Sequence, residues 1–156
     1  MNKNIHNLSR AIIIKDNHLL VANNPKAEFD FCYLPGGHIE HYESAQECLL
    51  RELEEEIGNL NFKIERFLGC LEYSFIPEKR DDLKCHAHEY NFHFLVDCKE
   101  LNINQIPVQI EKVAFKWINL DKINDVNLLP GPLKKLLPLW LKLNLDDAFA
   151  SQMTKL

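Results

Sequence analysis

The chain has 156 residues, of which 46% are hydrophobic, a length and composition that suit one domain with a packed core. Its formal net charge of −5 argues against broad binding to nucleic acid or to an anionic membrane, because both depend on neutralising phosphate. Five widely spaced cysteines without a C-x-x-C motif indicate reduced thiols. No apolar run is long enough for a signal peptide or a membrane span, so we expect a cytoplasmic protein.

The first predicted element is a β-hairpin. A β-branched run at 11–14 leads through the turn residues Lys15, Asp16 and Asn17 to an apolar run at 18–22. A loop follows from 23 to 33 and carries three aromatic residues. We expect Phe31 and Tyr33 to alternate into the core of the strand that enters Leu34, with stacking on a base as the alternative, and Phe29 is the residue expected to contact a ligand.

The stretch from Leu34 to Leu60 predicts a glycine turn followed by a helix. The tripeptide at 35–37 is Pro-Gly-Gly, and glycine lets a backbone approach a ligand closely. Ser44 is a suitable N-cap, and Glu47 three residues later completes a capping-box pattern. Gly58 is the expected end of the helix.

On a helical wheel this helix has an apolar arc of about 100° beside an acidic arc of similar width. The apolar residues expected to be buried are Leu49, Leu50, Leu53 and Ile57. The acidic residues are Glu52, Glu55 and Glu56. Carboxylates at these spacings repel one another, and a cluster of hard oxygen ligands is typical of a Mg²⁺ or Mn²⁺ site. The alternative is a solvated acidic face, but the adjacent Gly-Gly turn and the Arg51–Glu52 pair favour metal binding.

The fixed residues in this stretch follow the spacing G-x5-E-x7-R-E-U-x-E-E-x-G, where U is aliphatic. This resembles the signature of the Nudix (MutT-like) hydrolases. The resemblance implies that the backbone carbonyl of Gly37 and the carboxylates of Glu52, Glu55 and Glu56 bind divalent metal. It also implies that Arg51 orients one of these glutamates and that Glu52 is the first candidate for the base that activates water. A late glutamate can take that role in some members, and Glu111 is the residue that loosely matches it. Asn59 departs from the pattern, which has an aliphatic residue there.

Further strands are predicted at 62–75 and 88–96, separated by a charged loop at 76–84. On the first strand, alternation places Phe67, Gly69, Leu71, Tyr73 and Phe75 on one face. On the second, Glu89, Asn91 and His93 share a face that lines the substrate cleft if it turns toward the acidic helix. Lys79, Arg80 and Lys84 in the loop could contact phosphate, although a solvated loop is the commoner case. The run Cys85-His86-Ala87-His88 has no zinc-site spacing.

The last predicted elements are a strand at 113–118, a short helical stretch at 120–123 and a helix that begins after Pro130-Gly131-Pro132. The final helix has an apolar stripe at helical spacing: Leu133, Leu136, Leu137, Trp140 and Leu141. We expect this stripe to pack on the sheet, with a homodimer interface as the alternative. Pro138 should kink the helix or split it after Leu137.

Together these patterns predict an α/β fold in which helices cover both faces of a mixed central β-sheet. The Nudix resemblance implies the same α/β/α sandwich, with one domain over 1–145 and a frayed C-terminal tail at 146–156. It further implies a metal-dependent pyrophosphohydrolase that uses Mg²⁺ or Mn²⁺ and cleaves a nucleoside diphosphate linked to another group. A small nucleotide, either a nucleoside triphosphate or a nucleotide sugar, is the expected substrate. The alternatives are a catalytically silent nucleotide-binding module and a pyrophosphohydrolase of RNA 5′ ends.

Overall fold

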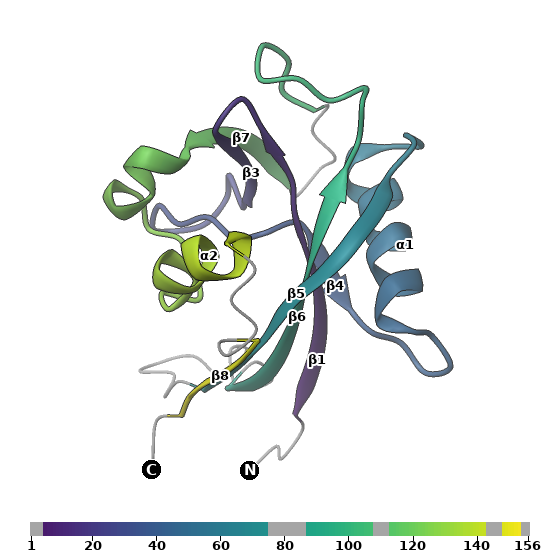
Figure 1. The fold of residues 1–156 in the computed structure, drawn as a ribbon, viewed down its shortest axis with the longest axis vertical. Helices are drawn as coiled ribbons and strands as arrows, with labels where there is room; N and C mark the ends of the chain where they lie inside the picture. Colours follow the sequence, from purple (N-terminus) through teal and green to yellow (C-terminus); the bar gives the residue numbers. More distant parts are fainter. Residues whose placement is uncertain (1–4, 75–86, 108–112, 143–147, 154–156) are drawn as a thin grey trace.

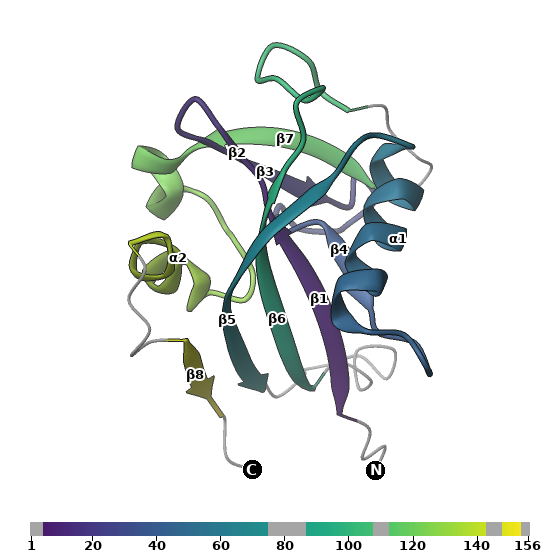
Figure 2. The same ribbon diagram turned by 45° about the vertical axis from the view of Figure 1, so that its right-hand side comes forward.

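The computed structural model describes residues 5–74, 87–107, 113–142 and 148–153. Five strands form the main sheet in the order β4-β1-β6-β5-β8, and three form a smaller sheet in the order β2-β3-β7. The main sheet is mixed, because β1 runs parallel to β6 and β5 parallel to β8 while the other neighbours are antiparallel. Helices α1 and α2 lie on opposite faces of this sheet (Figures 1 and 2). The predicted α/β class and layer arrangement are therefore confirmed.

The strands of the main sheet are β1 (His6–Ile12), β4 (Gly36–His38), β5 (Lys63–Ser74), β6 (His88–Asp97) and β8 (Phe149–Gln152). The smaller sheet consists of β2 (Ile14–Lys15), β3 (His18–Asn23) and β7 (Ala114–Asn119). The helices are α1 (Ala45–Ile57), the 3₁₀ helix η2 (Leu120–Asp125) and α2 (Leu133–Leu141). No helix in these ranges is both long and apolar enough to cross a membrane.

The predicted hairpin forms between β2 and β3. Its two turn residues, Asp16 and Asn17, have φ of 45° and 60°, the left-handed conformation that a tight hairpin turn requires. The residues before Ile13 do not join this hairpin. They form β1 in the main sheet, which places Leu8, Arg10 and Ile12 on the face toward α2.

Helix α1 begins and ends as predicted, but its packed face is rotated relative to the expected one. The Ser44 hydroxyl accepts a hydrogen bond from the Glu47 backbone N–H at 3.2 Å, and the Glu47 carboxylate accepts one from the Ser44 N–H at 2.8 Å. Cys48 is buried with three of the predicted apolar residues, whereas Leu50 is 39% exposed. The expected burial of Leu50 was wrong because the helix turns toward the side that carries Glu52 and Glu56.

Strand β5 also departs from the simple alternation. Bulges interrupt its pairing with β6 between Ile64 and Arg66 and between Phe67 and Gly69. Each bulge adds a residue and shifts the faces that follow. As a result Phe67 packs against Phe94 on the α1 side of the sheet, while Leu71 and Tyr73 belong to the core on the α2 side. The predicted shared face of Phe67 and Leu71 is therefore wrong.

Helix α2 covers the second face of the sheet with the predicted stripe. Leu133, Leu137 and Trp140 are buried. The helix continues through Pro138, so of the two expected effects of this proline, a kink or a split, the split does not occur. An added Cβ at Gly69 would overlap the Trp140 indole, so this glycine lets α2 pack closely on β5.

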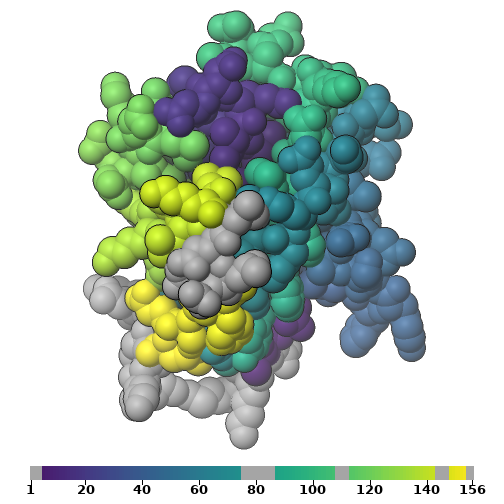
Figure 3. All heavy atoms as spheres, viewed as in Figure 1, coloured from purple at the N-terminus to yellow at the C-terminus, as the bar shows by residue number. Residues whose placement is uncertain are grey.

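The C-terminal residues form a strand where a frayed tail was expected. Residues 149–152 run parallel to β5, with pairs from Cys70–Phe149 to Tyr73–Gln152. Figure 3 shows these residues, in yellow, against the teal of β5. The unpaired edge of β5 gains backbone hydrogen bonds in this way, which local sequence pattern does not reveal.

We predict that Leu53→Ala lowers the free energy of unfolding by about 2–5 kcal/mol, because the fully buried side chain leaves a cavity between α1 and the sheet. Chemical denaturation measures the change. Leu50→Ala on the exposed side of the same helix is the matched control, and we expect it to cost less than about 1 kcal/mol. Equal losses for the two variants would contradict the observed rotation of α1.

Candidate metal and nucleotide site

The glycine turn and helix α1 meet at the edge of the main sheet. Gly37 lies in β4, and an added Cβ there would overlap the Glu52 carboxylate. Gly36 has φ of 123°, and an added Cβ would overlap the Ser9 carbonyl of β1. Two positions in the turn thus require glycine, one for conformation and one for the approach of a carboxylate. Beneath them, Cys48 donates its thiol proton to the His38 carbonyl at 3.2 Å.

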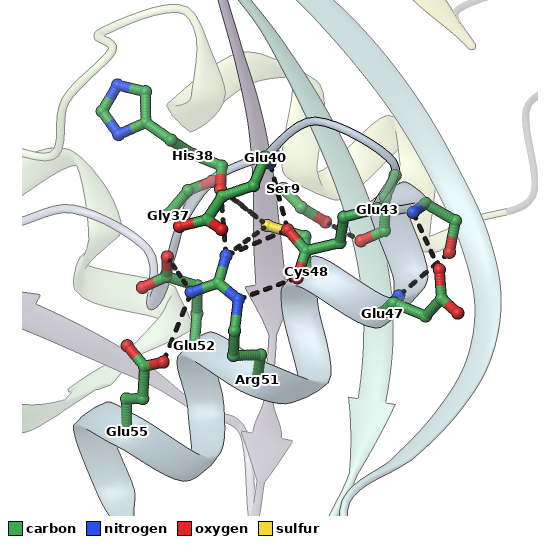
Figure 4. Close-up of polar contacts among 12 residues, drawn as sticks. Ser9, Gly37, His38, Glu40, Glu43, Glu47, Cys48, Arg51, Glu52 and Glu55 are labelled. Atoms are coloured by element: carbon green, nitrogen blue, oxygen red, sulfur yellow. Dashed lines mark hydrogen bonds and ion pairs between the residues drawn. The ribbon is translucent and has the colours of Figure 1, made fainter.

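Arg51 organises the carboxylates on this side of α1 (Figure 4). Its Nε and Nη2 donate to the two oxygens of Glu43 at 2.7 and 3.0 Å, a bidentate pair. Its Nη1 donates to Glu52 at 2.8 Å and, more weakly, to Glu55 at 3.5 Å. The guanidinium therefore fixes the orientation of Glu52. Glu43 had no assigned role from sequence, although its fixed place in the spacing pattern was a usable signal.

These contacts change the acidity of Glu43. The hydrogen bonds from the Arg51 side chain, followed by that from the Glu40 backbone, lower the pKa of Glu43 to about 2. The Glu43 carboxylate is therefore ionised at neutral pH and well below the pKa of an ordinary glutamate.

Glu56 lies deeper than its two partners. Its Oε2 accepts the Gly36 backbone N–H at 3.0 Å. Burial raises the pKa of Glu56 to about 7, and this outweighs the opposite effects of the Gly36 hydrogen bond and the Arg10 charge. A buried carboxylate of this kind is stabilised in its charged form by a nearby cation.

The donor set formed by Glu52, Glu55, Glu56 and the Gly37 carbonyl is suited in kind to a hard divalent cation, since all its atoms are oxygens. Within the described ranges, no three acidic, histidine or cysteine side chains gather around one point. Glu52 is turned to Arg51, Glu56 is turned to Gly36, and the Glu55 side chain is 62% exposed. Binding a cation between them would thus require these side chains to rotate toward one point.

A cleft of about 460 Å³ opens on the α2 face of the sheet. It has mainly apolar and aromatic walls and a polar floor from β6. Its lining residues are Arg10, Phe31, Tyr33, Leu34, Tyr73, Glu89, Asn91, His93, Leu129, Pro130 and Leu133. The volume and the aromatic lining suit a small ligand with a planar ring.

Arg10 connects this cleft to the carboxylate cluster. Its Nη1 donates to the carbonyls of Leu34 and Gly36 at 3.1 and 2.5 Å, and its guanidinium lies 5.7 Å from the centre of the Tyr33 ring. Gly36 therefore binds Glu56 through its N–H and Arg10 through its carbonyl. The two parts of the site are adjacent across the sheet edge. Sequence reasoning missed Arg10, although a lone arginine within an apolar run was a signal.

The aromatic loop differs from expectation. Phe31 and Tyr33 line the cleft; Tyr33 also packs against the core, as predicted, whereas Phe31 is not part of either core cluster. Phe29 is 59% exposed and is not among the residues that line the cleft. Phe29 instead packs against Phe31, with ring centres 5.0 Å apart. The end of the loop pairs with Ala22 of β3 and alternates with the opposite phase, since Cys32 and Leu34 are the fully buried residues.

The polar face of β6 lines the cleft, as its sequence pattern indicated. This face is directed away from α1, however, because Phe94 and Val96 on the other side of β6 pack with that helix. Among the described residues, those that line the cleft include none of β4 or α1, and Arg10 links the cleft to β4 through its hydrogen bond to the Gly36 carbonyl. Glu111, the loop cations at 79, 80 and 84, and the Cys85-His86 pair lie outside the described residues.

An acidic helix beside a glycine turn, with a nucleotide-sized cleft in the same α/β/α fold, is the arrangement expected of a hydrolase that acts on phosphoanhydride bonds. The NUDIX domain model matches residues 6–139. The chain thus belongs to the Nudix family and is a MutT-like hydrolase of phosphoanhydride bonds.

Individual relatives agree with this assignment. The chain is 29% identical over 128 residues to the 8-oxo-dGTP diphosphatase of Buchnera aphidicola subsp. Schizaphis graminum, a match that covers 81% of this chain and 85% of that protein. It is 39% identical over 59 residues to the ADP-ribose pyrophosphatase of Methanocaldococcus jannaschii, which covers 37% of this chain and 34% of that protein. A Nudix hydrolase structure from Nitrosomonas europaea superposes with a TM-score of 0.70 at 17% identity, covering 92% of this chain and 95% of that one.

We predict that the Glu43–Arg51 pair makes the stability of the protein sensitive to acid. Because the pKa of Glu43 is depressed from 4.5 to about 2 on folding, its stabilising effect is complete above pH 4.5 and is lost as the pH falls toward about 2. Glu43→Gln should therefore have a lower free energy of unfolding than wild type at neutral pH, and this difference should disappear as the pH falls from 4.5 toward about 2. Urea denaturation across a pH series measures it.

Glu54→Gln is the control, since Glu54 is exposed on the same helix. A gap between wild type and Glu43→Gln that stays constant from neutral pH to about pH 2.5 would show that the pair does not depress this pKa.

Proposed function

We propose that the chain is a metal-dependent pyrophosphohydrolase that cleaves a nucleoside triphosphate to a nucleoside monophosphate and pyrophosphate. Mg²⁺ or Mn²⁺ would be held by Glu52, Glu55, Glu56 and the Gly37 carbonyl. The observation that carries this proposal is the double contact of Gly36, which places the buried carboxylate of Glu56 next to the cleft that Arg10 lines. A phosphate chain at the sheet edge can then continue into a nucleoside in the cleft.

A triphosphate is favoured over a nucleotide sugar by the extent of similarity. The relative named 8-oxo-dGTP diphosphatase aligns with 81% of this chain, including the residues of the cleft floor, whereas the ADP-ribose pyrophosphatase aligns with 37%. A nucleotide sugar is the second candidate, supported by the higher identity of that shorter match. The net charge of −5 disfavours an RNA end, which would need a wider basic surface.

Each protein group has a role that follows from its position. Glu52 is the proposed base: it takes the proton of the attacking water, and Arg51 holds its carboxylate in place. The water oxygen forms a bond to phosphorus as the bond to the bridging oxygen breaks, and pyrophosphate leaves. Arg10 supplies positive charge where the phosphates enter the cleft. A divalent cation, when bound, would neutralise phosphate charge and make water more acidic.

The proposed activity is tested by measuring pyrophosphate and monophosphate release from a panel of nucleoside triphosphates, nucleotide sugars and triphosphorylated RNA. Each substrate is assayed with Mg²⁺, with Mn²⁺ and with a chelator. We expect release from triphosphates that is abolished by the chelator. No release from any substrate, with the protein folded, would favour the silent binding module.

We predict that Glu55→Gln lowers the turnover number by about 10²-fold or more and leaves the fold intact, because it removes a ligand charge without changing volume. Glu55 is largely exposed, so its loss should not unfold α1. Glu54→Gln, one residue earlier on the solvent side, is the control and should keep wild-type turnover. Unchanged turnover in Glu55→Gln would remove Glu55 from the proposed site.

A further inference from the structure

The C-terminal strand β8 extends the sheet that forms the floor of the cleft. Gln152 of β8 pairs in register with Tyr73 of β5, which pairs on its other side with Glu89 of β6. Ala150 is likewise paired with Leu71. Residues directly opposite one another on neighbouring strands point to the same face of a sheet. Ala150 and Gln152 therefore lie on the face of the cleft floor, one strand farther out.

Tyr73 belongs to two cavities. It lines the cleft together with Leu129, and both residues also line a second cavity of about 500 Å³ between β8 and the start of α2. Ala150 and Gln152 line this second cavity, and Figure 2 shows β8 beside β5 and below α2. Without β8, the strand order would make β5 an edge strand, and Tyr73 would keep a strand neighbour on one side only. A shift of Tyr73 would change the wall of the cleft.

Strand β8 has four residues and is held by contacts on both faces of the sheet. The Cys70 backbone N–H donates to the Ala148 carbonyl at 2.7 Å. On the face of the cleft, Ala150 packs against the core beneath α2. On the opposite face, the Ser151 hydroxyl donates to Glu72 Oε2 at 2.7 Å. A strand of this length makes few contacts, so each of them has a large share in the docking of β8.

Glu72 connects the strands on either side of β5. Its Oε1 accepts the Tyr90 hydroxyl of β6 at 2.7 Å, while Oε2 accepts the Ser151 hydroxyl of β8, and His88 Nε2 lies 3.3 Å from Oε1. The hydrogen bond from Tyr90, followed by that from Ser151, lowers the pKa of Glu72, so this acceptor is ionised at neutral pH. Hydrogen bonds to an ionised acceptor are roughly twice as strong as those between neutral groups. The Glu72 carboxylate therefore joins β8 to β5 and β6 on the face away from the cleft.

We propose that β8 positions one wall of the cleft: docked on β5, it holds Tyr73 in the place where the nucleoside end of the substrate meets it. Ala150 and Ser151 act through Tyr73 and are positioning residues. This rests on the proposed function only in that the nucleoside occupies the cleft. Strand β8 is at the opposite edge of the main sheet from β4 and the carboxylate cluster. Release of β8 therefore weakens nucleotide binding and leaves the cleavage step unchanged.

The first test follows Tyr73 directly and needs neither ligand nor turnover. The protein is labelled with fluorotyrosine, which gives one fluorine resonance for each of its four tyrosines, and Tyr73→Phe assigns the resonance of Tyr73. Ala150→Asp places a charge in an apolar contact, so we expect β8 to leave β5. The Tyr73 resonance should then shift or broaden, while that of the exposed Tyr42 stays in place. An unchanged Tyr73 resonance would overturn the proposal.

The second test measures nucleotide binding. Titration calorimetry compares AMP, CMP, GMP and UMP, and the monophosphate that binds best to the wild-type protein is used for the variants. Ala150→Asp should weaken its binding about tenfold and Ser151→Ala about threefold, because the first releases β8 and the second removes one hydrogen bond. With a triphosphate, the same variants should raise KM in proportion and keep kcat. Unchanged binding in Ala150→Asp, or a fall in kcat at constant KM, would overturn the proposal.

Asn61→Ala is the matched control. It removes a side-chain hydrogen bond of 2.6 Å to Glu100 at the opposite end of β5, and it should change neither the Tyr73 resonance nor nucleotide binding. Thermal melting shows which variants fold; if Ala150→Asp does not, Ser151→Ala decides by the same two measurements. Binding of none of the four monophosphates would remove the nucleoside from this cleft, and the proposal with it. Absence of turnover alone would contradict the proposed function and leave the resonance and binding results to decide this one.

Discussion

The close approach of helix α1 to the Gly36–Gly37 turn is the contact on which the rest of the site depends. A side chain at Gly37 would occupy the place of the Glu52 carboxylate, and one at Gly36 would overlap β1. The apolar side of α1, with Leu49 and Leu53 buried on the sheet, fixes the distance and rotation that this approach requires. Hydrophobic packing here has an electrostatic result, because it carries Glu56 into a partly buried position that an isolated acidic helix would avoid.

Two arginines reduce the repulsion among the carboxylates of α1, each in a different way. Arg51, on the helix itself, pairs with Glu43 and Glu52 and restrains the outer carboxylates. Arg10, on the other side of the sheet edge, adds positive charge near Glu56, but its hydrogen bonds go to the backbone carbonyls of Leu34 and Gly36. Neither arginine removes all the negative charge from the cluster. The remaining charge is the physical basis of the proposed metal dependence, independent of family membership.

The local features of this chain could be predicted from sequence, and those that depend on packing could not. The capping box at Ser44, the hairpin turn at Asp16-Asn17 and the acidic arc of α1 each arise within a few consecutive residues. The exposure of Leu50 depends on the rotation of α1 about its own axis against the sheet. Sequence periodicity determines this rotation only to about one residue position on the helix surface. The positions of Phe31 and Tyr33 follow from the pairing of this segment with Ala22 and Leu128, which buries Cys32 and Leu34 instead. The contact of Arg10 with Gly36 depends on the pairing of β4 with β1, which joins residues far apart in the sequence.

The separation of the site into two halves explains why the spacing pattern identifies the reaction and leaves the substrate open. The carboxylates and the glycine turn lie on one side of the sheet edge, within a continuous segment of about 25 residues. The cleft is assembled from β1, β6, the loop before β4 and the start of α2, which lie far apart in the chain. Substitutions on the floor of the cleft can change its shape and polarity without disturbing Arg51, Glu52 or the turn. A fold built in this way can keep one cleavage chemistry while its substrates diverge, because the residues that line the cleft lie almost entirely outside the pattern that identifies the family.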